Sequence, residues 1–203
     1  MIAKEKPVLT PGAWFIYSDI NFQILGELVR RISGQSLDLY CSEHIFEPLG
    51  MKDTRFNPPP DLRQRIAPTQ YQYENKGKML WGEVHDPISY EMGGVSGHAG
   101  LFSRADDLSI FAQMLLGGGS TQGVRILGQL MVEKMATPQT PPSKMALRGL
   151  GWDIDSPFAS NRSELPPVGS YGHTGFTGTS IWIDPISRTY VIILTNQVHP
   201  RGR

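Results

Sequence analysis

The sequence is poor in cysteine and has no surplus of either charge. Cys41 is the single cysteine among 203 residues, so no disulfide can form within the chain. This removes the usual sign of an oxidising compartment, but it does not exclude a periplasmic or secreted protein. Lysine and arginine number 19, as do aspartate and glutamate, so the formal net charge is zero. No nucleic-acid partner is expected, because binding to phosphate backbones depends on a surplus of cationic side chains.

Long apolar runs are also missing. No stretch approaches the roughly 18 apolar residues of a membrane-spanning helix, so the sequence predicts no membrane span. Residues 1–6 carry charge without a following apolar segment, and no signal peptide is visible there. The apolar residues around Cys41 recur at helical spacing, and we interpret this cysteine as a small buried hydrophobic residue rather than a reactive thiol.

The first part of the chain has helical periodicity. A helix is predicted over Asp19–Ser33, with Ser18 as its N-cap and Gly34 as its stop. Its apolar stripe consists of Ile20, Ile24, Leu25, Leu28, Val29 and Ile32. A second helix is predicted over Leu37–Phe46 and ends at Glu47-Pro48-Leu49-Gly50, so the two form an αα unit.

Between residues 51 and 100 this periodicity disappears, while prolines and glycines become frequent. A stretch of this length without regular structure is usually functional, as a lid or as the wall of a site. Helical spacing returns over Ser103–Leu116, where Ser103 is the expected cap. A short helix near Leu127–Met135 and a proline-rich turn at Pro138–Pro142 follow.

The last third has the pattern of strands. They are predicted over Leu150–Ile154, Val168–Thr174, Thr179–Ile183 and Tyr190–Thr195. The turn residues Asp184-Pro185-Ile186-Ser187 should join the last two strands as an antiparallel hairpin. Helices followed by a β-meander predict an α+β fold, in which an antiparallel sheet packs against helices. We expect one domain over residues 1–203, with a helical and loop region at 1–148 and the sheet meander at 149–197.

Two short motifs stand at the boundaries of predicted elements. Tyr17-Ser18-Asp19 directly precedes the first helix, and His173-Thr174-Gly175 ends a predicted strand. Each is weak by itself, because a tyrosine before a helix commonly packs and a single histidine on a strand is commonly structural. In this order they resemble the second and third motifs of the serine β-lactamase and penicillin-binding-protein superfamily, whose set is S-x-x-K, Y-x-N or S-D-N, and K-T-G.

The resemblance covers nearly the whole chain. A tyrosine that opens the second motif and a histidine in the third are typical of the class C-like and esterase-like branch, although Asp19 stands where asparagine is usual. The segments that look like family segments are Tyr17–Gly34, Ile45–Thr54, Gly93–Phe111 and Tyr171–Pro185. Val84-His85-Asp86 together with Gly94–Phe102 is most similar to a subgroup that includes cell-wall-recycling amidases and esterases.

The resemblance implies a β-lactamase/transpeptidase-like fold and a serine hydrolase that needs no cofactor. Such an enzyme is acylated on serine by a small-molecule substrate, which could be a β-lactam, an ester or a peptidoglycan-derived amide. Tyr17 would act as a phenolate-type base, and it would need a neighbouring positive charge because an unperturbed tyrosine has a pKa near 10. The lysine of S-x-x-K would supply that charge, helped by His173.

The other site residues follow from the same resemblance. His173 and Thr174 would hydrogen-bond the carboxylate or carbonyl of the substrate, and Gly175 would let the substrate lie flat along the strand edge. The backbone N–H of Phe176 would be one of two oxyanion donors. Asp19 would orient the substrate or the lysine.

The S-x-x-K motif itself is absent. No lysine of this chain has a serine three residues earlier. The family's closing C-terminal helix is also missing after His199. We therefore expect a domain that is incomplete at both ends and inactive alone. Two alternatives remain open, namely a non-catalytic binding module that keeps the carboxylate-binding groove and a purely structural fragment.

Other patterns favour no further ligand. His85, Asp86 and His98 match no zinc-ligand spacing, so no metal site is expected. The glycines of Gly93–Gly100 lack the Gly-Lys-Ser/Thr ending of a phosphate-binding loop, and no nucleotide is implied. The family resemblance is compatible with a periplasmic or secreted location.

Overall fold

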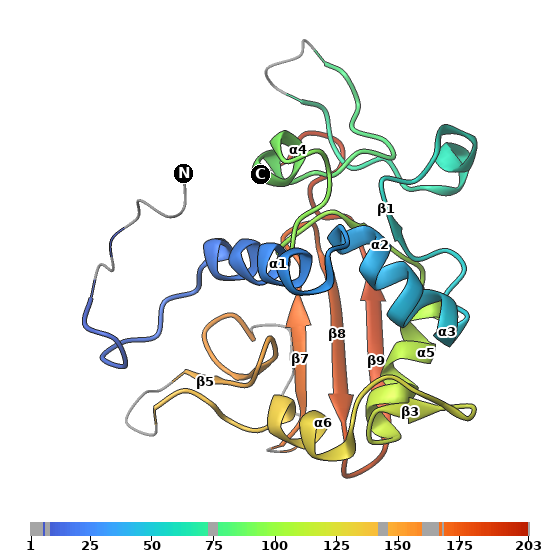
Figure 1. Cartoon of the computed structure of the whole chain (residues 1–203). Coiled ribbons are helices and arrows are strands. Elements are labelled where there is room, and N and C mark those ends of the chain that lie inside the picture. Colours follow the sequence, from blue (N-terminus) through green and yellow to red (C-terminus); the bar gives the residue numbers. More distant parts are fainter. Residues whose placement is uncertain are drawn as a thin grey trace.

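A five-stranded antiparallel sheet with helices packed against it forms the centre of the protein (Figure 1). The computed structural model describes residue 6 and residues 9–72, 77–141, 146–159, 167 and 169–202. The strand order is β5-β6-β7-β8-β9, and each neighbouring pair is antiparallel. The strands are β5 (Leu147–Arg148), β6 (Asp153–Asp155), β7 (Tyr171–Thr174), β8 (Thr179–Asp184) and β9 (Thr189–Leu194). The predicted α+β fold with an antiparallel sheet is confirmed.

Six α-helices are found within the described part of the chain. They are α1 (Asp19–Ser33), α2 (Leu37–Cys41), α3 (Glu47–Leu49), α4 (Pro87–Glu91), α5 (Ala105–Leu116) and α6 (Gln129–Ala136). A π-helical turn over Ser42–Phe46 joins α2 to α3, so the predicted second helix runs without a break to Leu49. Gly34 ends α1 with a φ of 75°, a conformation that glycine adopts without steric cost.

The segment between residues 51 and 100 is more ordered than its sequence suggests. It contains the 3₁₀ helix Pro60–Arg65, the short helix α4 and strand β1 (Arg55–Phe56), which pairs with β2 (Leu101–Phe102). A second small hairpin joins β3 (Ser120–Thr121) to β4 (Val124–Arg125). These elements are too short to produce a detectable hydrophobic period, so periodicity alone does not find them.

Three local expectations need correction. Ser103 does not cap α5, because its hydroxyl bonds to the Thr54 hydroxyl (2.7 Å) and Arg104 occupies the cap position. The sheet begins at Leu147 rather than at residue 149, because Leu147–Arg148 pairs with β6 through an irregular register. The strands expected at Leu150–Ile154 and Val168–Thr174 are found at Asp153–Asp155 and Tyr171–Thr174; Gly169 is a turn residue, and Val168 lies outside the described residues.

The hairpin of β8 and β9 has the predicted position and turn. Its register pairs Asp184 with Thr189 and Thr179 with Leu194. The Asp184 carboxylate accepts hydrogen bonds from the Ile186 backbone N–H (2.9 Å) and from the Ser187 hydroxyl, which stabilises the turn.

The buried core lies between one face of this sheet and the helices. Its residues are Phe46, Leu49, Met51, Ala112, Met114, Leu115, Val132, Ile154, Tyr171 and Ile183. Helix α5 packs on β9, where Gln113 Nε2 donates to the Tyr190 hydroxyl (3.2 Å). On the opposite face of β9, the side chains of Val191 and Ile193 are exposed. Their cross-strand partners Trp182 and Ser180 in β8 are buried on that same face, so the exposure there is seen at the edge strand β9.

The apolar stripe of α1 is largely exposed. Leu28 is 47% exposed and Ile32 is 79% exposed, and the other isoleucines and Leu25 of the stripe are exposed as well. Leu25 and Val29 line an open cavity together with Leu37 of α2, whereas Leu28 and Ile32 face solvent.

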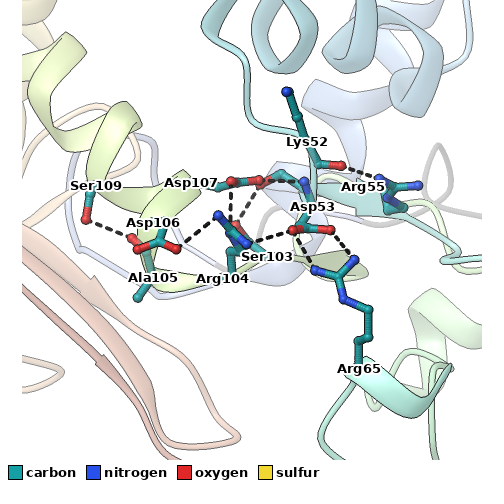
Figure 2. A network of polar contacts seen from close by, with 11 residues as sticks. Lys52, Asp53, Arg55, Arg65, Ser103, Arg104, Ala105, Asp106, Asp107 and Ser109 are labelled. Carbon is teal, nitrogen blue, oxygen red and sulfur yellow. Dashed lines mark hydrogen bonds and ion pairs between the residues drawn. The ribbon is translucent and has the colours of Figure 1, made fainter. Parts of the chain in front are cut away.

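A polar network joins the start of α5 to the loop that follows α3 (Figure 2). The buried carboxylate of Asp107 accepts hydrogen bonds from the Asp53 backbone N–H (2.8 Å) and the Thr54 hydroxyl (2.8 Å). Asp53 in turn forms a two-point ion pair with Arg65, at 2.8 Å for each contact. These contacts connect residues about 50 positions apart and fix the loop against α5.

Candidate active site

Tyr17 lies where the segment before α1 meets the end of β7. Its ring centroid is 6.2 Å from that of His173 and 4.9 Å from that of Phe158. In Figure 1 the arrow of β7 points toward α1, which explains how two motifs more than 150 positions apart come together. The fold thus brings the two sequence-predicted motifs to one place.

His173 is held by hydrogen bonds at both ring nitrogens. Its Nδ1 lies 2.7 Å from the backbone oxygen of Thr174, and its Nε2 lies 3.1 Å from Nη2 of Arg148. A carbonyl can only accept and a guanidinium can only donate, so Nδ1 carries the proton and Nε2 accepts. His173 is therefore neutral in this arrangement. Burial lowers its pKa, and the Arg148 charge lowers it further, against the opposing effects of Thr174 and Asp153.

Arg148 is the cation at the centre of this cluster. It is only 6% exposed, and its Nη1 donates to Oδ2 of the buried Asp153 over 2.8 Å. Its guanidinium carbon also lies 5.5 Å from the ring centroid of Tyr17 and 5.7 Å from that of Phe15, which is the geometry of a cation–π contact. The sequence predicts positive charge beside Tyr17 from the lysine of S-x-x-K, helped by His173. In this chain the positive charge that lies there is that of Arg148.

This cation does not make Tyr17 a phenolate. Burial raises the pKa of the Tyr17 phenol, and the nearby Asp19 carboxylate raises it further, while Arg148 opposes both effects. The balance lies above the usual tyrosine value, so Tyr17 is protonated at neutral pH in this chain. Ionisation would require a further positive charge close to the ring.

Asp19 lies exposed in the first turn of α1. The positive end of the helix dipole stabilises its carboxylate there. Its electrostatic effect on Tyr17 is in the direction that disfavours the phenolate.

Thr174, Gly175 and Phe176 form the tip of the β7–β8 connection. The Gly175 backbone N–H donates to the Thr179 oxygen (2.7 Å), and the Gly178 N–H donates to the Gly175 oxygen (2.9 Å). A Cβ at Gly175 would lie 2.3 Å from the Thr179 hydroxyl, so a larger residue there would have to displace that side chain. Phe176 is 78% exposed, and its ring stacks on His85 with 5.7 Å between centroids.

The last part of β7 has an edge that is free of strand pairing, where the Thr174 hydroxyl donates to the backbone oxygen of Phe158 (3.4 Å). Strand β6 pairs with β7 at Asp153 and Gly172, and the described residues show no pairing between these strands at His173 or Thr174. On the other side, His173 pairs with Ile181 and Thr174 with Ser180 in β8. An extended substrate could therefore add hydrogen bonds along this edge.

Two site residues were not expected from the sequence. Arg148 has no motif of its own, and Phe158 lies in a loop, so only their proximity to Tyr17 identifies them. The sequence could have pointed to Arg148 only through its pairing with Asp153 of the following strand. That pairing can be recognised only when the register of β5 against β6 is known.

His85, Asp86 and His98 do not form a metal-ligand cluster. His98 Nε2 lies 2.9 Å from Oδ1 of Asp86 and its Nδ1 lies 2.7 Å from the Ser96 hydroxyl, whereas His85 stacks on Phe176. Among the residues that the structure describes, no group of three or more His, Cys, Asp or Glu side chains could hold a metal ion. In the same part of the chain, every helix is too short or too polar to cross a membrane.

An α+β domain with a tyrosine and a histidine brought together beside a free strand edge is the arrangement of a serine β-lactamase or penicillin-binding protein. The family model described as "Beta-lactamase" matches residues 1–203, and the chain belongs to this family of serine hydrolases. It is 37% identical to a protein of Escherichia coli (strain K12) named "Putative D-alanyl-D-alanine carboxypeptidase", over 98% of this chain and 49% of that protein. The chain thus spans about half the length of the curated relatives that it matches.

Solved structures show the same fold. A β-lactamase from Mycobacterium bovis superposes with a TM-score of 0.65 at 25% identity, over 94% of this chain and 60% of that one. Simvastatin synthase from Aspergillus terreus superposes with a TM-score of 0.70 at 21% identity, over 95% of this chain and 52% of that one. The predicted β-lactamase/transpeptidase-like fold is confirmed.

Proposed function

We propose that this chain forms the substrate-binding and proton-transfer part of a serine acyl-transfer site that acts on D-alanyl or related peptidoglycan-derived amides. The cluster of Tyr17, His173 and Arg148 beside the free edge of β7 carries the proposal. The name of the curated relatives supports the substrate class. A cell-wall substrate would place the protein outside the cytoplasm.

Each residue has a role that its surroundings support. Tyr17 would take the proton of a serine nucleophile and pass it to the leaving amine, because a general base must lie close to the reacting groups. Arg148 would favour its ionised form through the cation–π contact. Since both nitrogens of His173 are already bonded, this histidine would shape the groove, while Thr174 would contact the substrate.

The nucleophile would come from a Ser-x-x-Lys segment outside these 203 residues. No lysine of the chain follows a serine at that spacing. The raised pKa of Tyr17 supports the same view, because burial and Asp19 outweigh Arg148 until a second cation approaches the phenol. The ammonium group of such a lysine would supply that charge. Oxyanion stabilisation would come from the backbone N–H of Phe176, together with that of the nucleophile.

The test compares the chain alone with a chimera. The chimera joins the part of the E. coli relative that this chain does not match, which we expect to carry the Ser-x-x-Lys segment, to the N-terminal end of this chain. We expect the chimera to release D-alanine from diacetyl-L-lysyl-D-alanyl-D-alanine and to form a covalent adduct with a labelled penicillin. The chain alone should do neither, as intact-mass spectrometry would show.

Two outcomes would contradict the proposal. A penicillin adduct on the chain alone would mean that the nucleophile lies elsewhere. A folded chimera that binds the peptide without releasing D-alanine would favour the second candidate, a non-catalytic binding module. The observation that favours this module is that Thr174 and the free edge of β7 are present without a nucleophilic Ser-x-x-Lys.

A further inference from the structure

A second group of reactive side chains lies away from the cluster around Tyr17. Ser96 and His98 belong to the glycine-rich segment that follows α4, and Asp86 is the residue before α4. Ser96 is 5% exposed, and the His98 side chain is also buried. Both residues line an open cavity of about 330 Å³ beside α1.

The three side chains form a hydrogen-bond chain with a defined direction. Oδ1 of Asp86 accepts from Nε2 of His98 (2.9 Å) and from the Ser89 backbone N–H (2.7 Å). A carboxylate can only accept, so Nε2 of His98 carries a proton, and in the neutral imidazole Nδ1 then has a free lone pair. The Ser96 hydroxyl, 2.7 Å from Nδ1, therefore donates to it. The serine is bonded to a neutral imidazole whose other nitrogen is held by a carboxylate.

This is the arrangement that activates a serine nucleophile, with the two ring nitrogens exchanged relative to most Ser-His-Asp triads. The recognition of such a triad rests on geometry and roles rather than on sequence position. The remaining walls of the cavity decide what could reach Ser96. They are apolar and include Phe22, Leu25, Val29, Leu37 and Leu101. None of the described residues that line the cavity is a lysine or arginine, so it favours an uncharged, apolar acyl group.

We propose that Ser96 is a second nucleophile, activated by His98 and Asp86, which is acylated by small uncharged esters with an apolar acyl chain. The Ser96 oxygen attacks the ester carbonyl carbon, and its proton moves to Nδ1 of His98. The bond between carbon and the leaving oxygen then breaks, and that oxygen takes the proton from Nδ1. Water attacks the acyl-serine by the same route, which releases the carboxylic acid and restores Ser96.

This site is independent of the proposed function. It uses none of the residues around Tyr17, and the peptide and penicillin substrates of that site are anionic, unlike the esters that the apolar cavity favours. A covalent adduct on a serine of this chain also cannot come from a Ser-x-x-Lys nucleophile, because the sequence contains no such motif.

The test is covalent labelling of the purified chain with diisopropyl fluorophosphate. The serine oxygen forms a bond to phosphorus and fluoride leaves, so the product is stable and can be mapped. Trypsin should release residues 79–104 as one peptide, which contains Ser89, Ser96 and Ser103. We expect one adduct per chain, located on Ser96 by fragmentation, with Ser89 and Ser103 as internal controls.

Variants separate activation from mere accessibility. Ser96→Ala should abolish the adduct, and His98→Gln should slow labelling by about 10²–10⁴-fold, the usual loss for a general base. Ser103→Ala is the matched control and should label at the normal rate, because its hydroxyl bonds to Thr54 and not to His98. Leu25→Trp should also block labelling, since it narrows the cavity without touching the hydrogen-bond chain.

The proposal would be overturned by a folded protein that gives no adduct on Ser96. It would equally be overturned if a folded His98→Gln variant labelled Ser96 at the normal rate. In either case the hydrogen-bond chain would only hold the glycine-rich segment against α4. If His98→Gln does not fold, Leu25→Trp decides the question, because unchanged labelling in that variant would also contradict the proposal.

Discussion

Nη2 of Arg148 donates a hydrogen bond to Nε2 of His173 over 3.1 Å, and this contact determines the charge state of the histidine. A histidine that accepts from a guanidinium must be neutral, so the positive charge beside Tyr17 belongs to the arginine. Asp153 holds Arg148 in place from the other side at 2.8 Å. His173 of the third motif thus contacts a buried ion pair that lies outside the motif.

Replacing Arg148 should change the pKa of both rings that it contacts. In Arg148→Met the pKa of His173 should rise, because a charge that lowers it and a donor to its Nε2 are lost. The pKa of Tyr17 should rise as well, since Arg148 is the group that lowers it. Titration followed by NMR of the imidazole and phenol carbons measures both. Arg148→Lys keeps a positive charge but lacks the planar guanidinium, so the pKa shifts of His173 and Tyr17 should be smaller in this variant. Unchanged pKa values of both residues in Arg148→Met would contradict this view of the cluster.

The stability of the chain should depend on pH through His173. The pKa of His173 is lower in the folded protein than its usual value near 6.5, so the unfolded chain binds more protons below that pH. The contribution of neutral His173 to the free energy of unfolding is therefore fully present above about pH 6.5. It is lost as the pH falls from there through the pKa of His173 in the folded protein. His173→Gln should flatten this part of the curve of Tm against pH. Burial also lowers the pKa of His85, so His85→Gln is the matched comparison. It should remove the part of the pH dependence of Tm that comes from His85.

The network in Figure 2 should contribute measurably to stability. Asp107→Ala leaves the backbone N–H of Asp53 and the hydroxyl of Thr54 without their acceptor. Because these groups are buried or half-buried, we expect a loss of about 1–3 kcal/mol in the free energy of unfolding. Asp106→Ala is the control, since Asp106 is exposed and, among the described residues, its carboxylate pairs with the surface arginine Arg104 alone. Urea denaturation measures both, and equal losses in the two variants would contradict the role of Asp107.

Tyr17 should be essential for turnover in the chimera. Tyr17→Phe should lower kcat by about 10²–10⁴-fold, because it removes the general base and keeps the ring that packs on Phe158. Residues that act as one catalytic unit are non-additive, so a double variant with the chimera's nucleophilic serine should be scarcely worse than the serine variant alone. Near-normal kcat in a folded Tyr17→Phe chimera would show that Tyr17 only packs at the start of α1.

The largely exposed stripe of α1 should make the chain alone self-associate. Exposed apolar patches of this kind favour association, and Leu28 and Ile32 lie on the stripe. Leu28→Glu and Ile32→Glu should shift the sedimentation coefficient toward that of a monomer at a given concentration. Ile186→Glu is the control, because Ile186 is exposed in the β8–β9 turn and not on α1. A wild-type chain that sediments as a monomer at all concentrations would contradict this expectation.

The sequence by itself determined the elements whose signals are local. The bounds of α1, the stop at Gly34 and the turn at Asp184 follow from side-chain period and backbone preference over a few residues. The two motifs at Tyr17 and His173 are likewise visible as short patterns, together with their order along the chain.

Only the tertiary structure decided what surrounds these residues. Arg148 and Phe158 meet Tyr17 because β5 pairs with β6 and β6 with β7, and no local pattern encodes this register. The same holds for the Ser96 and Asp86 contacts of His98 and for the exposure of the α1 stripe. Hydrophobic period shows that one face of a helix is apolar, but whether that face is covered depends on which distant segments pack against it.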